Sequence, residues 1–306
     1  MPKVSVIVPA YNAAHFLPAA LDSVLRQTWR DWEIVVADDG STDDTRSVVE
    51  QRIPSFGGRL RYLFQPNRGV SAARNAALHA ATGQFIALLD ADDVWLPTRL
   101  ERGMDVFDRD RGTGLVHARV LRMDPNGTVL GTPPSPHPKF LNGMIASHLY
   151  TRRAHVLCPT VLLRRECLDS AGCFDEQLRS TEDRDLWFRI TRLFSCSYID
   201  EPLAYYRVGQ NSLSRDWQRS WDSQVQFLDK HRKTGAATLR EYRQALANMH
   251  RERGDLLFNR HELESSIRSY AAAVSHDPLN VPNAYMLVRA LGEPFLSKLR
   301  SASNTI

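Results

Sequence analysis

Four short apolar segments alternate with helix-type patterns over the first hundred residues. The segments are Val4–Val8, Glu33–Ala37, Leu60–Phe64 and Phe85–Leu89. Largely apolar runs of this length are typical of strands buried inside a parallel sheet. Because helical spacing follows each run, the sequence predicts repeated βα units. Their repetition indicates an α/β fold with a doubly wound, mostly parallel sheet.

The intervening helices carry start and stop signals. A helix is expected from Thr42, with Ser41 as its N-cap and Asp44 as the capping-box partner. Another is expected across Val70–Ala81 and should end before Gly83.

After Asp93 the regular alternation gives way to a mixed region. We expect helices at 97–110, 164–170 and 183–193, strands at 115–123, from 129 and at 196–206, and loops at 132–138 and 209–214. The loop Thr132–Pro138 contains four prolines and could cover a binding site. The first domain is therefore predicted to span residues 1–214.

Residues 215–306 are expected to form an all-α C-terminal extension, because no strand pattern survives there. One stretch resembles a tetratricopeptide-type helix pair, through Gly254, Leu257, Tyr270, Ala273 and Pro278. A single pair cannot bury both of its faces. The extension should therefore pack on the first domain, on neighbouring helices or on a second copy of the chain, and it could bind a protein partner.

Composition limits the class of protein. No apolar run among the 306 residues approaches the ~20 needed to span a bilayer, and the N-terminus enters a strand directly, so we expect a cytoplasmic protein. Its cysteines, Cys158, Cys167, Cys173 and Cys196, form no CxxC pair, which favours free thiols over a zinc site. The net charge of +4 arises in residues 215–306, where it indicates either a solvated helical face or attraction to an anionic membrane surface or an acidic partner. Nucleic acid is not an expected partner.

Acidic side chains follow two of the expected strands. Asp38 and Asp39 follow the second, and the sequence Asp90-Ala91-Asp92-Asp93 follows the fourth. Carboxylates packed this closely repel one another unless a cation or solvent separates them. Oxygen ligands suit Mg²⁺ or Mn²⁺, ions that also neutralise a diphosphate leaving group. A solvated turn that leads into the next helix is the alternative.

The usual nucleotide signatures, GxGxxG after the first strand and the P-loop, are absent. Tyr11, in Pro9-Ala10-Tyr11-Asn12, could instead stack on a base while Asp39 accepts its hydrogen bonds. A simple turn with Asn12 as an N-cap is equally compatible with this segment. Arg68 or Arg74, near the start of a helix, could contact a phosphate, or either could pair with surface carboxylates.

Glu182 and Asp183 begin a later helix. Carboxylates in a first turn commonly stabilise the helix, so their position alone predicts no catalysis. In a linker between two apolar elements, however, such a carboxylate could reach a cleft and remove a hydroxyl proton.

Taken together, the motifs resemble those of family 2 glycosyltransferases. They are VSVIVPAYN at 4–12, DDGSTD at 38–43, NRGVSAARN at 67–75, LDADD at 89–93 and TED at 181–183. The resemblance covers residues 1–214. It implies a Rossmann-like GT-A fold, a nucleotide-sugar donor, most simply a UDP-sugar, a divalent cation and inversion at the anomeric carbon.

The same resemblance implies roles for individual residues. Asp183 would be the catalytic base, and Glu182 would orient it or bind the acceptor. Asp92 would bind the metal, and Asp90 would face the donor. The residues expected to contact the nucleotide are Pro9, Tyr11, Asp39 and Arg74.

Many relatives carry a histidine in the segment that corresponds to 206–212, and this chain has none there. A histidine metal ligand is therefore not expected. The resemblance implies an acceptor in a surface glycan or glycolipid, and so an enzyme that could work peripherally at the inner membrane face. A catalytically inactive nucleotide-sugar-binding or scaffolding protein and a nucleotidyltransferase are the competing hypotheses.

Overall fold

The computed structural model describes residues 3–133, 141–209 and 217–303. Two compact units divide the chain. The first comprises Met1–Leu149 and Ala154–Phe227, and the second comprises Tyr150–Arg153 and Leu228–Ile306. The expected domain border at Ser214 lies outside the described residues, and so does most of the proline-rich loop at 132–138.

A mixed sheet of nine strands, counted over the described residues, forms the centre of the first unit, in the order β3-β2-β1-β4-β8-β6-β9-β5 with β7 beside β6. The strands are β1 Val4–Ala10, β2 Trp32–Asp38, β3 Leu60–Phe64, β4 Phe85–Leu88, β5 Val94–Trp95, β6 Thr113–Met123, β7 Val129–Gly131, β8 Leu162–Arg164 and β9 Ser195–Arg207. Strands β1 to β4 pair in parallel, as β6 and β9 do, while β8 is antiparallel to both β4 and β6.

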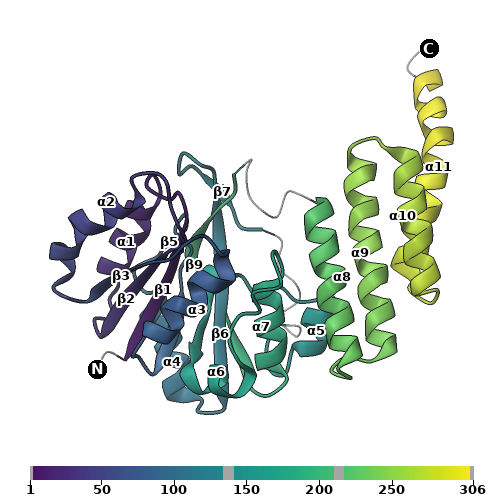
Figure 1. Ribbon diagram of the computed structural model, residues 1–306. Helices are drawn as coiled ribbons and strands as arrows, with labels where there is room; N and C mark the ends of the chain where they lie inside the picture. The colour runs from purple at the N-terminus through teal and green to yellow at the C-terminus, as the bar shows by residue number, and fades with distance from the viewer. Residues whose placement is uncertain (1–2, 134–140, 210–216, 304–306) are drawn as a thin grey trace. The chain divides into compact units, whose positions relative to one another are not determined.

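Helices cover both faces of this sheet (Figure 1). One buried cluster joins Val6 and Val8 to α1 Leu17–Leu25, α2 Thr45–Arg52 and α4 Arg99–Arg109. The other joins Ile7 to α3 Val70–Ala80, α5 Ala146–Tyr150, α6 Arg165–Ala171 and α7 Glu182–Thr191. Successive side chains of β1 thus pack into the cores on opposite faces of the sheet, as expected of a strand buried on both faces. The doubly wound α/β prediction is confirmed.

Because β1, β2 and β4 run in the same direction, their C-terminal ends lie at one edge of the sheet. That edge receives Tyr11, Asp39 and the acidic turn at 90–93. Ligands of open α/β sheets bind at such an edge. The fold therefore gathers at one place three motifs that lie far apart in the sequence.

Helix α2 differs from the expectation. It begins at Thr45 rather than Thr42, and the side chain of its N-cap residue, Asp44, makes no capping hydrogen bond. Ser41 does not cap the helix because its hydroxyl accepts the backbone N–H of Asn12 (2.9 Å). The capping-box prediction is wrong, and the residues that suggested it join two loops instead.

The second unit is helical, in agreement with the all-α prediction. Helix α8 Trp217–Lys233 leads into it, followed by α9 Leu239–Asn259, α10 Leu263–His276 and α11 Val281–Ser303. A complete capping box between Thr238 and Glu241 starts α9. Gly254 on α9 faces the buried ring of Tyr270 on α10 so closely that an added Cβ would lie 2.5 Å from that ring.

Among the described residues, no helix is both long enough and apolar enough to cross a bilayer.

Candidate active site

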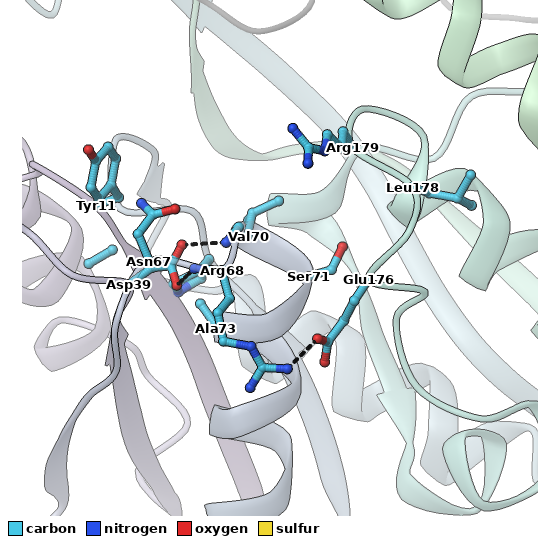
Figure 2. Close-up of a pocket in the computed structure, with 13 residues that line it drawn as sticks. Tyr11, Asp39, Asn67, Arg68, Val70, Ser71, Ala73, Glu176, Leu178 and Arg179 are labelled. Carbon is cyan, nitrogen blue, oxygen red and sulfur yellow. Dashed lines mark hydrogen bonds and ion pairs between the residues drawn. The ribbon is translucent and has the colours of Figure 1, made fainter.

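A cavity of about 530 Å³ opens at the C-terminal edge of the parallel strands. Figure 2 shows Tyr11 and Asp39 on one side of it and Leu178 and Arg179 on the other. The lining residues are Pro9, Ala10, Tyr11, Asp39, Asn67, Arg68, Gly69, Val70, Ser71, Ala73, Glu176, Leu178 and Arg179. Three of the residues expected to bind the nucleotide, Pro9, Tyr11 and Asp39, are therefore brought together.

Tyr11 presents its ring to this cavity and is 54% exposed. The loop that carries it is fixed by Asn12, whose side-chain oxygen accepts the backbone N–H of Thr42 (2.8 Å). Asn12 is not an N-cap, since α1 begins five residues later with Phe16 in the cap position. The alternative of a turn with Asn12 as its N-cap is therefore wrong in the assignment of the cap. The ring of Tyr11 offers an aromatic surface to a planar ligand.

Asp39 is 3% exposed, and three donors hold its carboxylate. Gln65 Nε2 donates to Oδ1 at 2.7 Å, as does the backbone N–H of Arg68 at 2.9 Å, while the N–H of Gly69 donates to Oδ2 at 2.7 Å. A carboxylate can accept about four hydrogen bonds, so one position is left for a ligand. The role of Asp39 in reading a base stays a prediction with compatible geometry.

Arg74 joins the two acidic motifs. Its guanidinium is 95% buried and donates from Nη2 to Asp90 Oδ1 and from Nη1 to Glu182 Oε1, both at 2.7 Å. It also lies over the Phe174 ring, 5.2 Å from the ring centroid. Because α3 delivers this cation between β4 and α7, the acidic turn after β4 and the start of α7 share one counter-charge. A phosphate contact of Arg74 stays a prediction.

The three carboxylates of the acidic turn have different environments. Asp93 is 1% exposed and accepts the backbone N–H of Arg207 (2.8 Å), and burial together with Asp92 and Asp90 raises its pKa well above the usual range. Asp92 reaches solvent, yet the surrounding protein and the charge of Asp90 raise its pKa to about 6. Asp93 is thus a buried structural acid, whereas Asp92 can meet a ligand.

The carboxylate oxygens at this turn suit a divalent cation such as Mg²⁺ or Mn²⁺ as ligands. Among the described residues no side chain donates a hydrogen bond to the Asp92 carboxylate, so its oxygens are available as hard ligands. The same part of the chain contains no group of three or more His, Cys, Asp or Glu side chains placed to hold a metal. The protein would therefore supply few ligands and leave the remaining positions to phosphate oxygens and water.

Glu182 and Asp183 occupy the first turn of α7, and neither is its N-cap. The N-cap is Thr181, whose hydroxyl donates instead to the carbonyl of Ser223 (3.2 Å). Glu182 accepts a hydrogen bond from Arg74, whereas the Asp183 carboxylate accepts the backbone N–H of the next residue, Arg184 (2.6 Å). Burial and the charge of Glu182 raise the pKa of Asp183 to about 6, although Arg74 opposes this. A carboxylate with that pKa is ionised at neutral pH and is more basic than an ordinary aspartate.

Two residues near the site have no assigned role in the sequence motifs. Burial raises the pKa of the Tyr206 hydroxyl on β9, and the nearby charges of the acidic turn at 90–93 and of Asp183 raise it further. Asn75 uses both ends of its amide on the backbone of Phe174, at 2.9 and 3.0 Å, and so fixes the segment before Glu176. The second of these could have been suspected from its place beside Arg74 in NRGVSAARN.

The sequence model of Glycosyl transferase family 2 matches residues 5–170. An uncharacterised glycosyltransferase of Nostoc sp. is 36% identical over 67% of this chain, and the chain spans 65% of that relative's length. The UDP-Glc:alpha-D-GlcNAc-diphosphoundecaprenol beta-1,3-glucosyltransferase of Escherichia coli is 30% identical over 74% of this chain and 87% of its own length.

Solved structures show the same fold. A mannosyltransferase from Pyrobaculum calidifontis, in complex with GDP-Man and Mn²⁺, has a TM-score of 0.65 at 22% identity and covers 99% of this chain and 83% of its own. S. aureus TarS in complex with UDP-GlcNAc has a TM-score of 0.60 at 22% identity, covering 94% and 89%. The chain belongs to glycosyl transferase family 2, and its first unit has the GT-A fold that the motifs implied.

Proposed function

We propose that this protein is an inverting, metal-dependent glycosyltransferase that moves a sugar from a UDP-sugar to an acceptor hydroxyl. The observation that carries the proposal is the position of Arg74, which holds Asp90 and Glu182 at 2.7 Å each. The turn suited to a metal diphosphate and the turn suited to a base therefore lie on either side of one guanidinium.

In this proposal the base of the donor stacks on Tyr11 and donates to Asp39, which has one free acceptor position. A bound Mg²⁺ or Mn²⁺ would neutralise charge on the departing diphosphate. Asp92 would be its protein ligand, and Asp90, held by Arg74, would face the donor sugar or ribose.

Asp183 would remove the proton of the acceptor hydroxyl as that oxygen attacks the anomeric carbon. Attack from the face opposite the nucleoside diphosphate inverts the configuration at that carbon. Its raised pKa of about 6 suits this role, because the carboxylate is ionised at neutral pH yet can accept a proton. Glu182, bonded to Arg74, would hold the start of α7 in place or bind the acceptor.

The donor and acceptor classes rest on the relatives. The E. coli relative is named for UDP-Glc and for a diphosphoundecaprenol acceptor, and two Pasteurella multocida relatives are named chondroitin synthase and hyaluronan synthase. We therefore propose a glycan or glycolipid acceptor and a cytoplasmic enzyme that associates peripherally with the inner membrane face.

The second unit is proposed to bind a protein partner or a second copy of the chain. Its last helix exposes Val281, Tyr285, Val288 and Leu291, which follow one another at helical spacing. Size-exclusion chromatography with light scattering tests self-association. A monomer at high concentration would leave only the protein partner.

The test of function is a donor-hydrolysis screen over UDP-, GDP- and dTDP-sugars, with Mn²⁺, with Mg²⁺ and with EDTA. We expect release of UDP from one UDP-sugar, dependent on the metal. Asp92→Asn should lower this turnover, and Asp108→Asn, an exposed carboxylate on α4, serves as the matched control. Nucleotide binding without turnover of any donor, with and without glycan acceptors, would favour the scaffolding alternative.

A further inference from the structure

Arg207, the last residue of β9, donates hydrogen bonds to the main-chain carbonyls of two turns. Its Nε donates to the carbonyl of Asp92 at 2.7 Å. Its Nη1 donates to the carbonyls of Asp124 and Pro125, at 3.0 and 2.9 Å, in the turn after β6. Its own backbone N–H donates to Asp93 Oδ1 at 2.8 Å. One residue thus makes four hydrogen bonds, two of them to the acidic turn.

The chemistry of arginine explains why this residue type stands there. A guanidinium presents five N–H donors in a rigid plane and can reach several carbonyls at once, which a lysine ammonium on a flexible stem cannot do with fixed geometry. The plane of Arg207 also lies over Phe16, 4.5 Å from the ring centroid, and the residue is 9% exposed. The acceptors of its guanidinium are neutral main-chain carbonyls, so their fixed geometry, and not an ion pair, holds that group in place.

The contact with Asp92 matters because little else restrains that residue. Its carboxylate receives no hydrogen bond from another side chain of the described residues, so its direction depends on its own backbone. That backbone is fixed by Arg207 and by the turn bond from the N–H of Asp93 to the carbonyl of Asp90 (3.0 Å).

We propose that Arg207 is a positioning residue for the divalent cation, which holds the main chain of Asp92 so that its carboxylate is set for metal binding. The proposal rests on the proposed function, in which Asp92 is the metal ligand. A positioning role and a general structural role predict different results. Loss of a positioning residue should lower only the part of the nucleotide affinity that depends on the metal. Partners of metal ligands commonly change metal affinity by about 10- to 100-fold when they are altered.

The test measures UDP affinity of the full chain by calorimetry, once with Mn²⁺ and once with EDTA. For Arg207→Lys we expect the affinity in EDTA to match the wild type, while the gain produced by Mn²⁺ falls by about 10-fold or more.

Arg164→Lys is the matched control. Arg164 also donates to two main-chain carbonyls, of Thr113 and Phe107, and lies over aromatic rings, but it does so where β6 begins, at the other end of that strand from the acidic turn. It should lose stability without losing the gain from Mn²⁺.

Arg207→Ala with millimolar guanidinium chloride provides a second measurement that does not depend on the lysine variant. Recovery of the Mn²⁺ gain on adding guanidinium supports the proposal, because the free ion restores the missing donors. An unchanged Mn²⁺ gain in a folded Arg207→Lys variant overturns it, as does an equal loss with Mn²⁺ and with EDTA. If Mn²⁺ does not raise the UDP affinity of the wild type, the metal role in the proposed function is wrong, and so is the positioning role of Arg207.

Discussion

Replacement of Arg74 by methionine should separate its electrostatic role from its packing. The guanidinium is 95% buried between Asp90 and Glu182, whose side chains are 24% and 10% exposed. Removal of one partner from a buried pair typically costs ~3–5 kcal/mol, because the other charge is left unpaired. Since Asp90 keeps some contact with water, we expect about 3 kcal/mol of lost unfolding free energy at pH 8, at the lower end of that range.

The loss should depend on pH in a definite direction. Arg74 lowers the pKa of Asp183, which is nevertheless raised to about 6, so its removal should raise that pKa further. A carboxyl whose pKa is higher in the folded than in the unfolded state makes the folded state bind more protons. The stability deficit of Arg74→Met relative to the wild type therefore shrinks as the pH falls. For the same reason, the acidic limb of its pH profile of kcat/KM should move above pH 6.

Denaturant unfolding from pH 5 to 8 and the pH dependence of kcat/KM test this reasoning. Arg61→Met is the control, because Arg61 pairs with Glu33 at 2.8 Å near the opposite, N-terminal ends of the parallel strands β2 and β3. It should destabilise the fold without moving the acidic limb. If the deficit of Arg74→Met is the same at pH 5 and pH 8, the account of Arg74 as a shared counter-charge is wrong.

Three further predictions concern single substitutions. Asp183→Asn should keep UDP affinity and lower transfer by ~10²–10⁴-fold, as expected for loss of a general base, and normal transfer rates would exclude it from that role. Asp93→Asn keeps an oxygen that accepts the backbone N–H of Arg207. It also removes a buried acid whose raised pKa makes the folded wild type lose stability as the pH rises. At pH 8 the melting temperature of the variant should therefore equal or exceed that of the wild type. Gly254→Ala should destabilise the second unit by ~1–3 kcal/mol, because its Cβ would lie 2.5 Å from the Tyr270 ring, and an unchanged melting temperature would contradict the close packing.

The fold was predictable wherever a periodic pattern extended over several residues. Leu60–Phe64 is a strand with the expected bounds, and α4 ends within a residue of the expected limit. The two-residue β5 and three-residue β8 were missed, because segments that short hold no periodic pattern. Ser41 misled the prediction since a hydroxyl that bonds a distant loop has the same sequence signature as an N-cap.

The site was predictable in its composition but not in its connections. The motifs supply Asp90, Asp92 and Asp183 through resemblance, and the parallel strands explain why the first two lie at the edge of the sheet. The bonds from Arg74 to Glu182 and from Arg207 to Asp92 link residues more than a hundred positions apart. No local pattern encodes such pairs, because they are formed by tertiary packing.

The loop that carries Tyr11 has a thermodynamic consequence for binding. Asn12 holds a left-handed backbone conformation, with φ at 48°, and its amide and N–H tie the loop to residues 41 and 42 before any ligand arrives. The conformational entropy of ordering this loop is therefore lost on folding and not on binding, where immobilising each side chain would cost ~0.5–1.5 kcal/mol. A bare nucleoside, with no phosphate and no sugar to transfer, should thus find a surface already shaped to receive it.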